Sequence, residues 1–203
     1  MCKKVIIIGA SGHAKVIADI VQKSGDRLLG FLDDAKANET VLGYKVLGTV
    51  KDYIKYKNEA EFIIGIGNNQ TRKKLSNEMN CKWYTAIHPA ATVGLCVNVN
   101  EGSCVMAGAV LNPCAQIGKH TIINTCAVVE HDCRIGDYCH LSPNSTICGM
   151  SSVEDNVWLS SGATIINGIS VCENTVIGAG AVVVKDIKTS GTYIGVPAKR
   201  KID

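Results

Sequence analysis

The sequence lacks the features that point to nucleic-acid binding or to a membrane. Its 203 residues carry a formal net charge of only +3, whereas nucleic-acid-binding domains usually show a clustered basic face. No run approaches the ~18 to 20 consecutive apolar residues of a membrane-spanning helix, although 46% of the residues are hydrophobic. We therefore expect neither nucleic acid nor a membrane as a partner, while a small anionic ligand remains compatible with the charge.

Metal-binding and export signals are also missing, although the chain contains ten cysteines. No two cysteines are spaced as Cys-x-x-Cys, and the apolar stretch at residues 5–10 runs straight into Gly-Ser-Gly-His, unlike a signal peptide. We expect a cytoplasmic protein whose thiols are reduced and serve as small apolar side chains. No metal site is expected.

What the sequence does contain is an aliphatic residue at every sixth position from 93 to 183. The residue two places before each of these positions is usually small, with exceptions at Val97, Val157 and Ile169. The sixteen aliphatic positions are Val93, Val99, Val105, Leu111, Ile117, Ile123, Val129, Ile135, Leu141, Ile147, Val153, Leu159, Ile165, Val171, Ile177 and Val183.

A period of six matches neither a 3.6-residue helix nor a single amphipathic strand, so the repeating unit must be longer than one element. Short strands that coil around a common axis have such a period if six residues form one side of a triangle and eighteen form one turn. The aliphatic and small residues then point inward, and neighbouring coils bury each other's apolar surface. The sixteen hexads predict a little over five coils.

The first eighty residues predict a different fold. Strands are expected at residues 4–9, 28–32 and 61–66, and helices at 14–23, 50–56 and 69–79. Alternation of strands and helices is typical of a small parallel α/β domain of Rossmann type. We place this domain at residues 1–82 and the repeat domain, with a basic tail, at residues 83–203.

Loops that follow the strands are the expected binding region, because open parallel sheets bind ligands beyond the carboxyl ends of their strands. Residues 9–13, Gly-Ala-Ser-Gly-His, open the first helix, whose N-terminus can hold a phosphate. They do not form the full G-x-G-x-x-G fingerprint of dinucleotide sites. Asp33 and Asp34 follow about twenty residues later. Together these loops favour a mononucleotide-type ligand.

The triplet Glu130-His131-Asp132 is the clearest chemical signal in the repeats, because a carboxylate beside a histidine can fix its tautomer and raise its basicity. Such a triplet can also be a solvated surface feature. Residues eighteen apart stack on adjacent coils at ~4.8 Å, which puts Gly149 beside His131 and leaves room for a substrate. His140 lies half a coil from His131, so the two histidines can share a pocket only between subunits.

The order of motifs along essentially the whole chain resembles one family. The chain is similar to the sialic-acid O-acetyltransferase-like family of hexapeptide-repeat acyltransferases, and most similar to its bacterial nucleotide-linked 4-amino-sugar N-acetyltransferases, which include the UDP-4-amino-sugar enzymes of bacillosamine synthesis. The motifs are Val-Ile-Ile-Ile-Gly-Ala-Ser-Gly-His-Ala-Lys-Val at residues 5–16, Gly-Phe-Leu-Asp-Asp at 30–34, Gly-Asn-Asn-Gln at 67–70, His-Pro-Ala-Ala at 88–91, Asn-Thr-Cys-Ala-Val-Val-Glu-His-Asp at 124–132 and Gly-Val-Pro-Ala-Lys at 195–199.

The resemblance implies a left-handed parallel β-helix behind the Rossmann-like domain, and a homotrimer with active sites between its subunits. It also implies transfer of acetyl from acetyl-CoA, the co-substrate, to the 4-amino group of a nucleotide-linked 4-amino-4,6-dideoxy sugar. UDP is the nucleotide expected first. The alternatives are O-acetylation of sialic acid or another sugar hydroxyl, and a hexapeptide-repeat scaffold without catalytic activity.

Roles for single residues follow from the same resemblance. His131 matches the general base, and Asp132 matches the acidic residue that assists it, although similar members of the family have glutamate at that position and Glu130 is a second candidate. His140 matches an active-site histidine near the acetyl group. The resemblance places Gly12, His13, Asp33, Asp34, Asn68, Arg72 and Asn124 at the nucleotide sugar, and Gly149, Lys185, Lys199 and Arg200, with His140, at acetyl-CoA.

Overall fold

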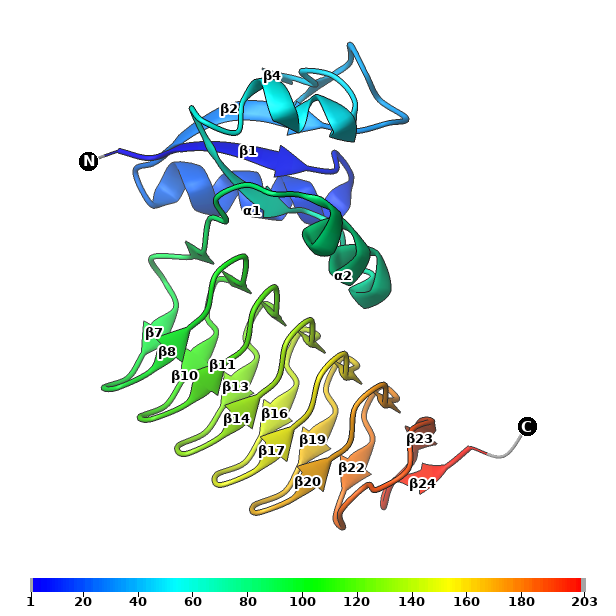
Figure 1. The fold of residues 1–203 in the computed structure, drawn as a ribbon. Coiled ribbons are helices and arrows are strands. Elements are labelled where there is room, and N and C mark those ends of the chain that lie inside the picture. Colours follow the sequence, from blue (N-terminus) through cyan, green and yellow to red (C-terminus); the bar gives the residue numbers. More distant parts are fainter. Residues whose placement is uncertain (1, 202–203) are drawn as a thin grey trace.

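The computed structural model describes residues 2–201 and shows an α/β unit seated on one end of a three-sided prism of short parallel strands (Figure 1). The N-terminal unit contains β1 (Lys4–Ile8), α1 (Gly12–Lys23), β2 (Arg27–Leu32), β3 (Thr40–Val41), β4 (Tyr44–Lys45), the 3-10 helix η1 (Val50–Lys55), β5 (Glu61–Ile64) and α2 (Asn69–Glu78).

The N-terminal sheet is parallel, with the order β2-β1-β5, and it confirms the strands and helices predicted for this region. Central strand β1 is buried from Val5 to Ile8, because α1 covers one face of the sheet while η1 and α2 cover the other. The antiparallel hairpin of β3 and β4 was not predicted, because its two-residue strands are too short to show a period.

The prism is built from three sheets, one on each side. The first consists of β7 (Thr92–Val93), β10 (Val110–Leu111), β13 (Val128–Val129), β16 (Thr146–Ile147), β19 (Thr164–Ile165) and β22 (Val182–Val183). The second consists of β8 (Asn98–Val99), β11 (Gln116–Ile117), β14 (Arg134–Ile135), β17 (Ser152–Val153) and β20 (Ser170–Val171).

The third side, which we call the His140 sheet, faces α2. It consists of β6 (Ala86–Ile87), β9 (Cys104–Val105), β12 (Ile122–Ile123), β15 (His140–Leu141), β18 (Trp158–Leu159), β21 (Val176–Ile177), β23 (Thr192–Ile194) and β24 (Lys199–Arg200). Strands β6 and β23 extend the prism to about six turns. The prediction of a little over five coils was too short, because it left out Ile87 of β6, which stands six residues before Val93, and because β23 pairs with β21 at a spacing of sixteen residues instead of eighteen.

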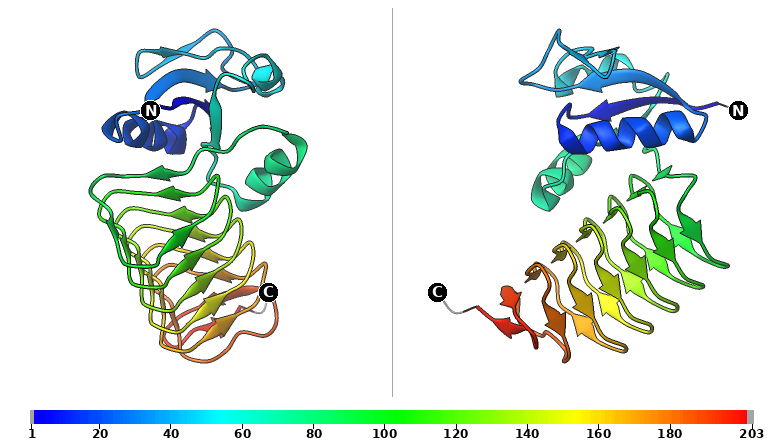
Figure 2. Two further views of the ribbon diagram at one scale, coloured as in Figure 1. Left: turned by 60° about the vertical axis from the view of Figure 1, so that its left-hand side comes forward. Right: turned by 180° about the vertical axis from the view of Figure 1, so that it is seen from behind.

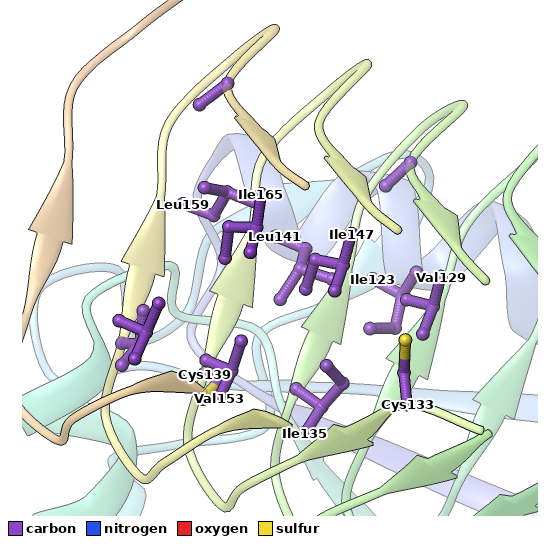
Figure 3. Close-up of a cluster of buried hydrophobic side chains, with 14 of the residues drawn as sticks. Ile123, Val129, Cys133, Ile135, Cys139, Leu141, Ile147, Val153, Leu159 and Ile165 are labelled. Carbon is purple, nitrogen blue, oxygen red and sulfur yellow. The ribbon is translucent and has the colours of Figure 1, made fainter. Parts of the chain in front are cut away.

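Side chains of the hexad positions fill the prism, as the sequence predicts. Each coil pairs with the next in a register of eighteen residues, for example Val129 with Ile147 and Leu141 with Leu159. Figure 3 shows these aliphatic side chains pointing to the prism axis, with Cys133 and Cys139 among them. Both cysteines are fully buried, and burial raises the pKa of the Cys139 thiol to about 12. They serve as small apolar residues here.

The two units share one core. Helix α1 lies between the N-terminal sheet and the first coils (Figure 2), where its Ile17 and Val21 belong to the same buried cluster as Cys104, Met106 and Ile122 of the prism. This shared core fixes the N-terminal loops relative to the His140 sheet. Among residues 2–201, no helix is long and apolar enough to cross a bilayer.

Candidate active site

His131 lies at one edge of the prism, in the turn between β13 and β14. The equivalent turns of the other coils stack above and below it, and we call this column of residues 95–96, 113–114, 131–132, 149–150 and 167–168 the His131 corner. Backbone hydrogen bonds join each turn to the next, such as Asp132 N–H to the Pro113 carbonyl at 3.1 Å and Met150 N–H to the His131 carbonyl at 3.0 Å. The corner is therefore a continuous ladder.

Asp132 holds the imidazole of His131. Its Oδ2 lies 2.8 Å from His131 Nδ1, and both side chains are about half exposed. If the carboxylate accepts the proton of Nδ1, the other ring nitrogen, Nε2, has its lone pair free to accept a proton. Of the two carboxylates that the sequence offered, this geometry favours Asp132, whose carboxylate contacts the imidazole directly.

Gly149 stands one coil above His131, as the eighteen-residue register predicts. A Cβ atom added at Gly149 would lie 2.7 Å from His131 Nε2, so no other residue fits there without displacing the imidazole. Glycine is therefore required beside the free nitrogen by close approach, and the missing side chain keeps this nitrogen accessible.

His140 lies on a different side of the prism, in β15 of the His140 sheet. Its Nε2 is 3.1 Å from Asn124 Nδ2, and its ring lies 6.4 Å from that of His13 between centroids. The prediction that His131 and His140 face different edges of one chain is confirmed by these elements. His140 and Asn124 instead form a cluster with the first helix of the N-terminal unit.

Burial keeps the histidines of this cluster neutral. Desolvation first, then the charge of His140 and that of Arg72, lower the pKa of His13 to about 3. Desolvation and Arg72 lower the pKa of His140 to about 4, against a backbone hydrogen bond to Gly67 that raises it. The buried Nε2 of His13 has no hydrogen-bond partner among the described residues.

A cavity of about 570 Å³ adjoins His140, between the start of α2 and the His140 sheet. Trp158 stacks on His140 with ring centroids 6.2 Å apart, and its Nε1 donates to Ser142 Oγ at 2.9 Å. Sequence analysis missed Trp158, although it lies eighteen residues after His140 and the register could have placed it there. The cavity is lined by Gly67, Asn68, Asn69, Gln70, His140, Asn156, Trp158, Asn174 and Val176.

The predicted nucleotide loops meet at the end of the N-terminal sheet. Asp33 ties them together, because its Oδ2 accepts from Ala10 N–H at 2.8 Å and its Oδ1 from Ala35 N–H at 2.9 Å. Asp34 Oδ1 accepts from Val50 N–H at 2.9 Å. Gly12, the first residue of α1, faces open space. An exposed helix N-terminus with this opening has the character of an anion site.

Asn68 and Arg72 do not lie free in a loop, because both side chains hydrogen-bond to other parts of the protein. Asn68 caps α2 by accepting from Thr71 N–H at 2.9 Å. Arg72 is only 1% exposed, and its nitrogens donate to six oxygens: the carbonyls of Ile66, Gly67, His120, Tyr138 and Cys139, and Asn69 Oδ1. A guanidinium has only five N–H groups. Its donors fasten α2 to the prism, and its place at the nucleotide sugar stays a prediction.

The predicted coenzyme A cations lie near the far end of the prism. Lys185 occupies the position three coils beyond His131, about 14 Å along the axis at ~4.8 Å per coil. Lys185 and Lys199 line a recess of about 230 Å³, and Arg200 donates to the Ser190 carbonyl at 3.2 Å. The structure thus separates these cations from His131 by a distance that an extended ligand must span.

Comparisons with known proteins match both parts of the chain. Residues 4–79 match the PglD N-terminal domain family, and residues 114–149 match the bacterial transferase hexapeptide family of six repeats. A histidine mutant of perosamine N-acetyltransferase from Caulobacter crescentus, solved with CoA and GDP-perosamine, is 39% identical with a TM-score of 0.94, and the match covers 98% of this chain and 97% of that one.

Two further relatives agree with this match. The acetyltransferase domain of PglB from Neisseria gonorrhoeae FA1090, in complex with acetyl coenzyme A, is 32% identical with a TM-score of 0.93, over 99% of this chain and 100% of that one. UDP-N-acetylbacillosamine N-acetyltransferase of Bacillus subtilis (strain 168) is 37% identical over 114 residues, which are 52% of each protein. The chain spans about half or less of the curated relatives it matches.

Removing the Arg72 clamp should loosen α2 from the prism. We expect Arg72→Met to lower the free energy of unfolding by about 3 kcal/mol or more, because several buried carbonyls lose their donors. Denaturant unfolding, with amide hydrogen exchange in α2, measures this. Lys74→Met, at a lysine 75% exposed on the same helix, is the matched control and should have little effect. An Arg72→Met protein with unchanged stability and exchange would contradict the clamp.

The free energy of unfolding should decrease as the pH falls below about 6.5, because of the buried histidines. The pKa of His13 is about 3 in the folded chain, against 6.5 for an ordinary histidine. Below pH 6.5 the unfolded chain therefore binds a proton that the folded chain does not, and each such histidine costs up to about 1.4 kcal/mol per pH unit. Denaturant unfolding between neutral pH and pH ~4 should show a shallower loss for His13→Asn than for the native chain. Lys15→Gln, on the exposed side of α1, should keep the native slope, and an unchanged slope in His13→Asn would contradict the assignment.

Proposed function

The chain belongs to the family of left-handed β-helix nucleotide-sugar N-acetyltransferases, and from this membership we propose that it transfers acetyl from acetyl-CoA to the 4-amino group of a nucleotide-linked 4-amino-4,6-dideoxy sugar. The observation that carries the proposal is the imidazole of His131, held by Asp132 and open at Nε2 beside Gly149. UDP stays the nucleotide predicted from the sequence, while relatives named for UDP- and GDP-linked sugars leave the choice to experiment.

His131 acts as the general base in this proposal. A sugar amine is largely protonated at neutral pH, so attack on a thioester requires a group that removes a proton before or during formation of the C–N bond. Nε2 of His131 accepts that proton, while the Asp132 carboxylate stabilises the imidazolium that forms. The base can then return the proton to the departing sulfur. No covalent acyl-enzyme is required.

We assign Gly149 to the stabilisation of the reacting acetyl group. Attack on the thioester places negative charge on the carbonyl oxygen, and a backbone N–H aimed at that oxygen contributes about 3 to 4 kcal/mol when its geometry is good. We assign this role to the Gly149 N–H, because the absent side chain leaves space for the thioester beside Nε2. Lys185, Lys199 and Arg200 provide positive charge for the phosphates of coenzyme A farther along the prism.

The sugar nucleotide is assigned to the N-terminal loops and the cluster around His140. Gly12 and the start of α1 offer an open helix N-terminus for phosphate, and Asp33 holds the loop beside it. His13 and Asn124 continue from this opening towards His140. Since His13 and His140 are both neutral, they contribute hydrogen bonds without adding charge.

A homotrimer completes the site. His131 lies at one corner of the prism and His140 on another side, so a single chain cannot bring the base to the His140 cluster. Threefold assembly of prisms with parallel axes brings the His131 corner of one chain to the His140 sheet of its neighbour. The half-exposed state of His131 and Asp132 in the single chain agrees with this requirement.

A thiol-release assay with acetyl-CoA tests the function. UDP-, dTDP- and GDP-linked 4-amino sugars should release CoA thiol, and the preferred nucleotide should show the highest kcat/KM. Free sialic acid and a nucleotide sugar with a 4-hydroxyl in place of the amine are the controls. Turnover of sialic acid alone would favour the O-acetyltransferase alternative. No turnover of any sugar would favour the scaffold.

Substitution of the base should reduce catalysis without disturbing assembly. We expect His131→Ala to lower kcat by about 10² to 10⁴, the usual contribution of a positioned general base. Asp132→Asn should also lower kcat, whereas Glu130→Gln, the matched change on the other side of His131, should have a small effect. Steady-state kinetics and sedimentation measure both properties. A fully active His131→Ala trimer would remove His131 from the role of base.

A further inference from the structure

Two exposed cysteines stack on each other in the His131 corner, and the proposed chemistry uses neither of them. Cys96 and Cys114 are both free and exposed, and they lie eighteen residues apart. Strands β8 and β11, which follow them, pair in the same register, with Asn98 opposite Gln116. The two cysteines thus occupy equivalent positions on adjacent coils.

The geometry of this pair suits a disulfide. Both residues have the same left-handed backbone conformation, with φ of 59° at Cys96 and 67° at Cys114, and Cys114 N–H donates to the Leu95 carbonyl at 2.9 Å. Stacked coils put their Cα atoms about 4.8 Å apart, within the ~4.4 to 6.8 Å found across disulfides. The Cys96 thiol lies near enough to raise the pKa of the Cys114 thiol. A bond between the sulfurs is within reach, and because disulfides most often span ~5.5 to 6 Å between Cα atoms, its closure tends to spread the two turns.

The pair continues directly into the site of the base. Asp132 is the next residue of the same column, and its N–H donates to the carbonyl of Pro113, the residue before Cys114, at 3.1 Å. Asp132 in turn holds His131 Nδ1 at 2.8 Å. Spreading of the Cys114 turn away from Cys96 therefore acts through one backbone hydrogen bond on the residue that orients the imidazole.

We propose that Cys96 and Cys114 form a dithiol site that low-molecular-weight disulfides oxidise, and that the resulting disulfide slows acetyl transfer by displacing Asp132 from His131. The Cys114 thiolate attacks the small disulfide, forming a mixed disulfide and releasing one small thiolate. The Cys96 thiolate then attacks the Cys114 sulfur, forming the Cys96–Cys114 bond and releasing the second. The protein loses two hydrogens and two electrons, and the small disulfide becomes two thiols.

The rate of oxidation of the cysteine pair should depend on pH in one direction. Desolvation, followed by the neighbouring Cys96 and Asp132, raises the pKa of the Cys114 thiol. Thiolate is the attacking species, so oxidation should accelerate as the pH rises above neutral. Asp132 and Cys96 face Cys114 along the column, and Glu130 and His131 lie in the turn above it.

The experiment treats the assembled full-length enzyme with glutathione disulfide at mildly alkaline pH. Peptide mapping should find residues 96 and 114 joined, with the loss of two hydrogens from the chain, and dithiothreitol should reverse it. The effect on acetyl transfer rests on the proposed function: kcat should fall on the order of tenfold, as expected when a catalytic group is misplaced by a fraction of an ångström, and recover on reduction. The NMR titration of the His131 ring should shift on oxidation, which provides a readout independent of any sugar substrate.

Two variants separate this site from other thiols. Cys114→Ser removes the thiol that attacks the small disulfide and cannot close the Cys96–Cys114 bond, so it should stay active under oxidation. Cys126→Ser, at an exposed cysteine in another column, should respond to oxidation like the native enzyme. The proposal is overturned if no 96–114 link forms in the assembled enzyme, if Cys114 stops at the mixed disulfide, or if the link leaves both kcat and the His131 titration unchanged. If the enzyme acetylates no sugar, but the 96–114 disulfide forms reversibly and the His131 titration shifts, then only the proposed function is contradicted.

Discussion

The inward stacking of aliphatic side chains forces every coil of the prism to repeat after eighteen residues, and the rest of the structure depends on that register. Val129, Ile147 and Ile165 can bury one another only if their strands pair without a shift. Turns at the corners then stack as well, because they connect strands whose positions are already fixed. Gly149 lies against His131 for this reason, and the base is placed by packing that is remote from its own side chain.

A second constraint joins the N-terminal unit to this rigid body. Arg72 carries a positive charge into the junction, where five of its six oxygen partners are backbone carbonyls. Removal of the charge from water is unfavourable, so the clamp holds only if every donor is used. The same buried charge depresses the pKa values of His13 and His140. One residue thereby connects the docking of α2 with the protonation state of the histidines beside the cavity.

Sequence periodicity was sufficient to predict the prism, the inward cysteines and the contact of Gly149 with His131, since each follows from a spacing of six or eighteen residues. It was not sufficient where contacts cross between the two units. The loop sequence around Arg72 looks like a ligand loop, and only the docking of α2 shows that its donors are occupied. The approach of His13 to His140 likewise depends on how α1 packs against the first coils. The spacing of residues within either segment does not predict this packing.

The left-handed conformation of the corners explains why a short carboxylate suits the residue beside the base. Asp132 has a φ of 60°, a region that costs most residues about 1 kcal/mol or more and that aspartate tolerates better than glutamate does. From this backbone the Asp132 carboxylate already reaches Nδ1 of its neighbour at 2.8 Å. An additional methylene would have to fold back to make the same contact. A departure from the glutamate that the resemblance implies at this position therefore preserves the support of the imidazole, because the corner itself aims the shorter side chain.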